Sequence, residues 1–292
     1  MLMAVPNVSE GVSKAALEAI SEAFRPARVL DIHSDADHNR AVFTLASEQG
    51  QLAAELANGT KVAHQLVSLE DRSGVHPHVG AVDVVPVVYL KPEDRGAACA
   101  EALLTAHLIA KRCATPVFLY GELAGGRERA ELREGGLRGL AARMADGQHL
   151  PDFGPKSMSR VVGATLVSAR PPMVAFNLVL DGNESLERAK EIAAELRESG
   201  GGLPGVRAIG LWLDGPARSQ VSCNVHDPFT VPLAEIVGFV RERAAVESAE
   251  LVGLAPRAAI DGFPQDLKWL DFDPTRHVVE NALGDEGVYG SR

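Results

Sequence analysis

The sequence predicts an α/β protein made of two units of the split βαβ kind, each a mixed or antiparallel sheet covered by helices. Two observations lead to this prediction. Segments whose apolar residues alternate, as in strands, take turns with segments whose apolar residues recur every three or four positions, as in helices. The order strand, helix, two strands, helix then occurs in the first half and again after Pro171 and Pro172. These prolines mark the expected boundary between residues 1–170 and residues 171–292.

The first unit is expected to open with a strand and a helix that packs against it. Residues 3–8, MAVPNV, are the strand candidate, and residues 9–24 carry small or apolar side chains at helical spacing. Two strands over 29–34 and 41–47 follow, joined by the turn formers DADHN. The remaining elements are a helix over 50–66, a buried strand over 82–90, a helix over 92–112 opened by Pro-Glu-Asp, and a strand over 116–122.

A different composition separates this part from the second unit. Residues 125–152 are rich in Arg, Glu and Gly and are expected to form a helical excursion on the surface. They lead into PDFGPKSMSRVVGAT, residues 151–165, which is predicted to be a loop that returns to an apolar strand.

The second unit repeats the rhythm of the first. Residues 173–180, MVAFNLVL, predict a strand, and residues 185–198 predict a helix that stops at the glycines 200–202. Two further strands, 206–213 and 220–225, precede an amphipathic helix. That helix is expected over residues 233–246.

Composition and charge exclude several classes of function. The 292 residues are 46% hydrophobic, which is sufficient for one large or two ordinary domains. A net charge of −10 without a block of consecutive Lys or Arg argues against a nucleic-acid or anionic-membrane partner, because both require a positive surface. The isolated cysteines Cys99, Cys113 and Cys223 predict reduced thiols in a cytoplasmic protein. Neither a leader segment nor an apolar stretch of about 18 residues is recognisable, so export and membrane anchoring are not expected.

The stretch SGVHPHVG, residues 73–80, is a candidate catalytic loop. Glycines on both sides permit close backbone approach, and Pro77 stiffens the chain directly after His76. A histidine exchanges protons near neutral pH with little adjustment of its pKa, so His76 is a candidate proton carrier. Spacing alone allows the alternative of a turn whose histidines are solvated or cap the backbone.

Two other polar stretches have competing interpretations. DIHSDADHNR, which contains His33 and Arg40, has nitrogen and oxygen donors for a metal ion, but ordinary turn chemistry is favoured and no metal is expected. The segment PDFGPKSMSRVVG combines turns with Lys156, Arg160 and hydroxyl groups, which suits a flat, anionic ligand or a plain surface loop. No phosphate-binding glycine motif and no nucleophile elbow occurs, so an enzyme of this sequence would position substrates and move protons.

Taken together, these stretches resemble one family, glutamate formimidoyltransferase. The resemblance covers nearly the whole chain, in the family's order: VPNVSEG, NRAVFTLA, GVHPHVGAVDVVP, PVFLYGE, PDFGPKSMSRVVGAT, VAFNLVL, AIGLWLD, QVSCNV and ELVGLAP. It implies two subdomains of ferredoxin-like topology and a homodimer. It also implies a transferase without the cyclodeaminase domain of the animal proteins, one that moves the formimino group of N-formimino-L-glutamate to N5 of tetrahydrofolate during histidine degradation.

The resemblance also implies roles for particular residues. The family's catalytic histidine maps onto His76, and tetrahydrofolate, the co-substrate, is expected on a glycine-bounded loop. That loop comprises Gly154, Pro155, Lys156, Ser157, Met158, Ser159, Arg160, Val161, Val162 and Gly163. Because both substrates carry carboxylates, cations must lie near the pocket, and the candidates for substrate binding are Arg40, Arg72, His78 and His33.

His78 stands where the family has arginine, and His33 stands where the family commonly has aspartate. Two alternatives to formimino transfer therefore remain open. One is a folate-dependent homologue that uses another donor such as N-formylglutamate, or that binds folate without catalysis. The other is an α/β scaffold that serves as an interaction module.

Overall fold

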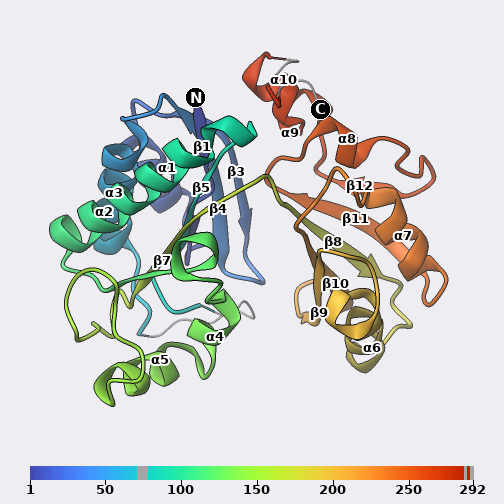
Figure 1. Cartoon of the computed structure of the whole chain (residues 1–292). Helices are drawn as coiled ribbons and strands as arrows, with labels where there is room; N and C mark the ends of the chain where they lie inside the picture. Colours follow the sequence, from blue (N-terminus) through green and yellow to red (C-terminus); the bar gives the residue numbers. More distant parts are fainter. Residues whose placement is uncertain (71–77, 286–287, 290–292) are drawn as a thin grey trace. The chain divides into compact units, whose positions relative to one another are not determined.

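The computed structural model describes residues 1–70, 78–285 and 288–289. The chain divides into two compact units, Met1–Pro171 and Pro172–Arg292, each with its own sheet and core (Figure 1). His76 and Arg72 lie outside the described residues.

One mixed sheet forms the centre of the first unit. Its order across the sheet is β3, β4, then β1 and β2, then β5, β7 and β6. The strands are β1 (Leu2–Ala4), β2 (Asn7–Val8), β3 (Arg28–Asp35), β4 (Arg40–Ser47), β5 (Val82–Val88), β6 (Val117–Leu119) and β7 (Thr165–Arg170). With the helices between them, β1 to β5 give the ferredoxin-like order, and β7 and β6 extend the sheet in parallel with β5.

Three helices cover one face of this sheet, α1 (Lys14–Ala23), α2 (Leu52–Leu66) and α3 (Arg95–Cys113) (Figure 1). Ala41, Phe43 and Leu45 of β4 point into the core beneath these helices. Because side chains alternate along a strand, Arg40 and Thr44 point to the opposite face. The sequence thus assigns the polar residues of β4 to the face that α1 to α3 leave uncovered.

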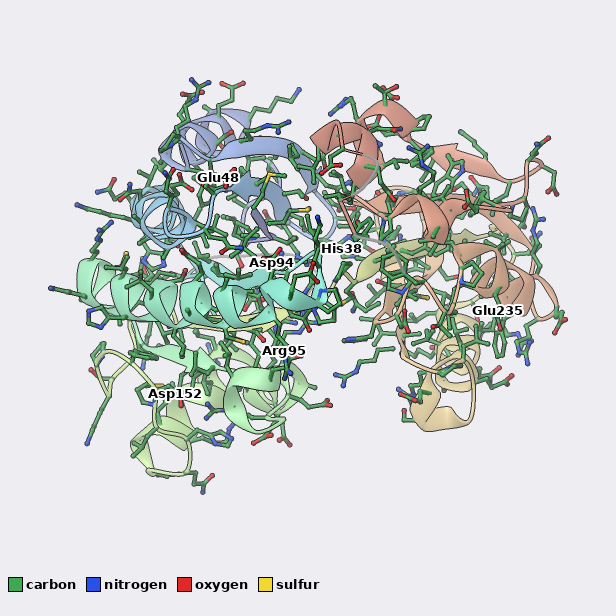
Figure 2. All side chains as sticks on the ribbon, turned by 45° about the horizontal axis from the view of Figure 1, so that its top comes forward. His38, Glu48, Asp94, Arg95, Asp152 and Glu235 are labelled. Carbon is green, nitrogen blue, oxygen red and sulfur yellow. The ribbon has the colours of Figure 1, made fainter. Side chains whose placement is uncertain are left out.

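The excursion over residues 125–152 has a structural role that its composition did not indicate. It contains α4 (Arg129–Arg133) and α5 (Gly136–Ala145), and its Leu132, Leu140 and Met144 close a second core against β5, β6 and β7. Asp152, labelled in Figure 2, accepts a hydrogen bond from the backbone N–H of Leu119 at 2.7 Å and pairs with Arg127. These contacts fix both ends of the excursion to β6.

A second ferredoxin-like sheet forms the centre of the second unit, in the order β12, β11, β8, β10, β9. The strands are β8 (Val174–Leu180), β9 (Val206–Leu213), β10 (Arg218–Val225), β11 (Val246–Val252) and β12 (Lys268–Leu270). The helices are α6 (Leu186–Leu196), α7 (Leu233–Arg241), α8 (Arg257–Ile260), α9 (Pro274–His277) and α10 (Val279–Leu283). Ser185 caps α6, its Oγ accepting from the backbone N–H of Arg188 at 3.1 Å.

The predicted elements are confirmed, with differences at their ends. The strand predicted over residues 3–8 is interrupted at Pro6, which has no N–H to donate to a neighbouring strand, and becomes β1 and β2. The helix predicted over 233–246 ends at Arg241, because the chain turns and enters β11. Within the described part of the chain, no helix combines the length and hydropathy that a membrane span requires.

His64 makes the stability of the first unit sensitive to acid. It lies in α2, its Nδ1 is 3.3 Å from the hydroxyl of Thr115, and burial lowers its pKa to about 4. In the unfolded chain the pKa returns to about 6.5, so the unfolded state binds more protons between these values. The stabilisation is complete above pH 6.5 and is lost as the pH falls towards 4.

Between pH 6.5 and pH 4, the free energy of unfolding should therefore fall in both proteins, and it should fall by about 3 kcal/mol more in the native protein than in His64→Gln. Urea unfolding at closely spaced pH values measures this difference. His107, exposed on α3, provides the matched control, since His107→Gln should keep the native pH dependence. Equal acid sensitivity in the native protein and His64→Gln would contradict the assignment.

Candidate active site

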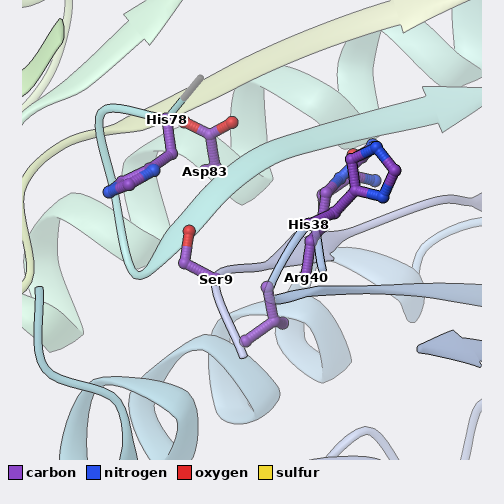
Figure 3. Close-up of a pocket in the computed structure, with 7 residues that line it drawn as sticks. Ser9, His38, Arg40, His78 and Asp83 are labelled. Atoms are coloured by element: carbon purple, nitrogen blue, oxygen red, sulfur yellow. The ribbon is translucent and has the colours of Figure 1, made fainter. Parts of the chain in front are cut away.

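A small pocket lies where three segments of the first unit meet. The segments are the end of β2, the turn between β3 and β4, and the chain that leads into β5. Figure 3 shows the pocket, which is lined by Asn7, Val8, Ser9, His38, Arg40, His78 and Asp83. Histidine, guanidinium, carboxylate and hydroxyl groups are therefore gathered in one place.

The turn between β3 and β4 is held by its own side chains. Asp35 accepts the backbone N–H of His38 at 2.8 Å with one oxygen, and its other oxygen lies 3.0 Å from Nδ1 of His38. Burial acts to raise the pKa of Asp35, but the hydrogen bonds from His38 and the charges of the histidines outweigh it and lower the pKa. Asn39 adopts a positive φ of 46° and accepts from the N–H of Gly11 at 3.0 Å.

These contacts are those of an ordinary polar turn. In the described ranges, no three His, Cys, Asp or Glu side chains are arranged to hold a metal ion. The turn instead presents His38 and Arg40 to the pocket.

Arg40 is the principal cation of the pocket. Its Nη2 donates to the side-chain oxygen of Asn7, while its buried Nε has no hydrogen-bond partner among the described residues. Burial, together with the positive charges of Arg133 and Arg129, lowers the pKa of Arg40 to about 9, and Asp83 acts in the opposite direction. Arg40 is thus charged at neutral pH and has one donor that an anionic ligand could use.

Asp83 is the carboxylate of the pocket. The register between β2 and β5 shifts where Asn7 pairs with Val84 and Val8 pairs with Val82, so Asp83 occupies a bulge. Its Oδ1 accepts the backbone N–H of Val79 at 2.7 Å, and its Oδ2 pairs with Nη2 of Arg133. Asp83 therefore joins the strand, the chain before it and α4.

The loop over residues 154–163 is attached directly beside the pocket. The N–H of Ala81 donates to the carbonyl of Val162 at 2.8 Å, and the N–H of Ala164 donates to the carbonyl of Val79 at 2.9 Å. Gly80 is required at this crossing, because a Cβ there would lie 1.9 Å from the carbonyl oxygen of Ala164. Ser9 holds the other side of Gly80, its Oγ donating to the carbonyl of Gly80 at 2.8 Å.

The structure brings only some of the predicted site residues together. Arg40 and His78 both line the pocket. His33 lies on β3 opposite Val42, and therefore on the same sheet face as Arg40. The predicted folate loop, with Lys156 and Arg160 exposed, adjoins the pocket through its backbone near Gly163.

Three residues of this region were missed by sequence reasoning. Asp83 had a recognisable signal, a carboxylate inside the apolar run AVDVVPVV. Asn7 and Arg133 had none, because each acquires its meaning from a partner distant in sequence, Arg40 and Asp83 respectively. The arginines outnumber the carboxylates around Asp83, which suits an anionic ligand in a chain of negative overall charge.

Comparison with known proteins gives a consistent result over most of the chain. Residues 1–170 match the family profile described as formiminotransferase domain, N-terminal subdomain, and residues 175–262 match that of the formiminotransferase domain. Glutamate formimidoyltransferase of Streptococcus pyogenes serotype M1 is 33% identical over 291 residues, which cover 96% of this chain and 97% of that protein.

Two further relatives show how the chain compares in length. Glutamate formimidoyltransferase of Thermoplasma acidophilum is 29% identical over 270 residues, 88% of each chain. Formimidoyltransferase-cyclodeaminase of Sus scrofa is 33% identical over 306 residues, which cover 96% of this chain and 56% of that protein. The chain thus spans little more than half the length of this last relative.

Proposed function

The chain belongs to the formiminotransferase family, and from this premise we propose that it moves the formimino group of N-formimino-L-glutamate to N5 of tetrahydrofolate. The products are 5-formiminotetrahydrofolate and L-glutamate, so the protein is a one-carbon group transferase of histidine degradation. The observation that carries this function is the match of both units to the two family profiles, together with 33% identity to a glutamate formimidoyltransferase over 96% of the chain.

His76 is the proposed proton carrier. As N5 attacks the formimino carbon it must lose a proton, and the nitrogen of the departing glutamate must gain one. One histidine can serve as base in the first step and acid in the second. The adjoining segment supports this role, because His78 lines the pocket and Val79 to Ala81 are hydrogen-bonded beside it.

Tetrahydrofolate is proposed to bind along the loop from Gly154 to Gly163. The loop is exposed over most of its length, and its end at Val162 and Gly163 is paired with Gly80 and Ala81 next to the pocket. Lys156 and Arg160 are exposed on it and can meet the carboxylates of the folate tail. The pterin ring would then pack on backbone and aliphatic side chains.

The donor's carboxylates are proposed to bind at Arg40, with His78, His33 and Arg72 as further candidates. The Nε of Arg40 supports the first of these, because it has no hydrogen-bond partner among the described residues and a carboxylate would supply an acceptor. His33 and Arg40 share one face of the sheet, and His78 and Arg40 share the pocket. A glutamate derivative carries two carboxylates, which matches a site with several cations.

A steady-state assay with tetrahydrofolate and N-formiminoglutamate tests the function, with N-formylglutamate as the alternative donor in parallel. The alternative is included because His78 replaces a permanent cation of the family by a titratable group. Turnover with N-formiminoglutamate, followed through the spectrum of the folate product, is expected. Turnover with N-formylglutamate alone would identify that compound as the donor. Absence of turnover with both donors, in a preparation that binds tetrahydrofolate, would contradict the proposed transferase activity.

A cytoplasmic homodimer is also part of the proposal. Cys99, Cys113 and Cys223 are free thiols in the structure. Burial raises the pKa of Cys113 to about 11 and that of Cys223 to about 12, so neither forms a thiolate readily, which suits a reducing compartment. The homodimer is supported by the resemblance to the family.

A further inference from the structure

Asp83 is a buried carboxylate in β5, a strand whose other residues are all apolar. All seven residues of β5 are buried, and the side chain of Asp83 is about as inaccessible as its valine neighbours. Taking a carboxylate out of water costs free energy unless partners compensate it, and an apolar residue would fill the same space at lower cost. The position of Asp83 therefore indicates a role beyond stability.

One oxygen of Asp83 fixes the backbone beside the pocket histidine. Oδ1 accepts the N–H of Val79 at 2.7 Å, and Val79 directly follows His78. The carbonyl of Val79 accepts from the N–H of Ala164 at 2.9 Å, so both backbone polar groups of Val79 are held. These two hydrogen bonds therefore fix the position of the backbone just before β5, next to the pocket.

The other oxygen of Asp83 fixes a cation. Oδ2 pairs with Arg133, which stands at the end of α4, next to the fully buried Leu132. The positive charge of Arg133 opposes protonation of Arg40, whereas the negative charge of Asp83 favours it. Without Asp83, the repulsion between the two guanidinium groups would act with their main counter-charge removed.

We propose that Asp83 is a positioning residue of the transfer site, an inference that rests on the proposed function. It holds the peptide after His78 in place through Val79, and it holds Arg133 and offsets its charge at the pocket where Arg40 would receive an anionic donor. Asp83 itself exchanges no proton with the substrates. Its partners come from two different segments, Val79 from the chain before β5 and Arg133 from α4, so it aligns the histidine segment with the cations of the pocket.

Three variants separate positioning from plain stability. Asp83→Ala removes both contacts, and Asp83→Asn leaves one acceptor oxygen for two donors, so kcat should fall about 100-fold in each. In Arg133→Gln the contact between Asp83 and Val79 remains, so kcat should change only a few fold. The pocket loses one positive charge, so the KM for N-formiminoglutamate should rise about tenfold. The KM for tetrahydrofolate should stay near the native value in Arg133→Gln.

Glu101 provides the matched control. It is another buried carboxylate that accepts backbone N–H groups, from Gly50 and from Ala53 at 2.8 Å, and it lies on α3 beneath the opposite face of the sheet. Glu101→Gln should lower Tm without changing kcat. If Glu101→Gln and Asp83→Ala lower kcat alike, Asp83 acts only through stability and the proposal is wrong.

Amide hydrogen exchange at Val79 gives a readout that does not depend on turnover. Exchange should accelerate at Val79 in Asp83→Ala and stay native in Glu101→Gln and Arg133→Gln. Unchanged exchange in Asp83→Ala, or native kcat in the folded variant, overturns the proposal. If the native protein transfers neither a formimino nor a formyl group, the proposed function fails, and accelerated exchange would still support the anchoring of Val79 by Asp83.

Discussion

Replacing His76 by alanine is expected to lower kcat by about 10²–10⁴-fold without unfolding the protein. The reaction requires a proton to leave N5 and a proton to reach the departing nitrogen, and no other side chain is proposed to perform both transfers. The measurement is kcat at saturating tetrahydrofolate and N-formiminoglutamate. Added imidazole should restore part of the turnover of His76→Ala, because it can supply the missing proton carrier.

His107→Ala is the matched control for this prediction. His107 is an exposed histidine on α3, next to the ring of Phe153 and on the helix-covered side of the sheet. Its removal should leave kcat at the native value. Near-native turnover in folded His76→Ala would assign the proton transfers to another group, and His38, which lines the pocket and is held by Asp35, would be the next residue to replace.

Replacing Arg40 by glutamine is expected to lower kcat/KM for N-formiminoglutamate by about 10- to 100-fold, because a hydrogen bond to a charged group contributes about 1.5–3 kcal/mol. Glutamine removes the charge and keeps an aliphatic stem at this position, so the fold should persist. The affinity for tetrahydrofolate should change little. Steady-state kinetics with each substrate varied in turn separates the two effects.

The pH dependence gives a second check on Arg40. Since its pKa is lowered to about 9, Arg40 loses its charge as the pH rises through that value. The KM for the donor should therefore rise above pH 9 in the native protein and stay flat in Arg40→Gln. Arg25, which is 71% exposed and pairs with Glu22, supplies the control, since Arg25→Gln should keep native kinetics at every pH. An unchanged donor KM in Arg40→Gln would place the carboxylates elsewhere.

Much of the fold was predictable because it depends on local periodicity. Ala41, Phe43 and Leu45 stand at alternate positions of a short, largely apolar run, which predicts a buried strand, and all three enter the core. β11 was not predicted, because Glu247, Ser248 and Glu250 interrupt its apolar residues. It is a strand because it pairs with β8, a contact between distant parts of the chain.

The role of the excursion over residues 125–152 was also beyond local patterns. Its many charged residues indicated a surface segment, and its Arg133 and Leu132 gave no sign of their partners. In the folded chain, Leu132 enters a core with strands β5 to β7, and Arg133 reaches Asp83. A segment with few apolar residues can still complete a core when the sheet that it packs against supplies most of the apolar side chains.

By itself the sequence determined the alternation of strands and helices, the repeat of one topology in two units and, through its resemblance to a family, the reaction and the histidine that is proposed to carry it. Only the tertiary structure decided that Arg40 meets Asn7, that Asp83 holds both Val79 and Arg133, and that the loop ending at Gly163 crosses the chain at Gly80. The physical reason is the range of the interactions. Periodicity and turn chemistry act between neighbours in sequence, whereas these contacts form between segments that the order of strands in the sheet brings together.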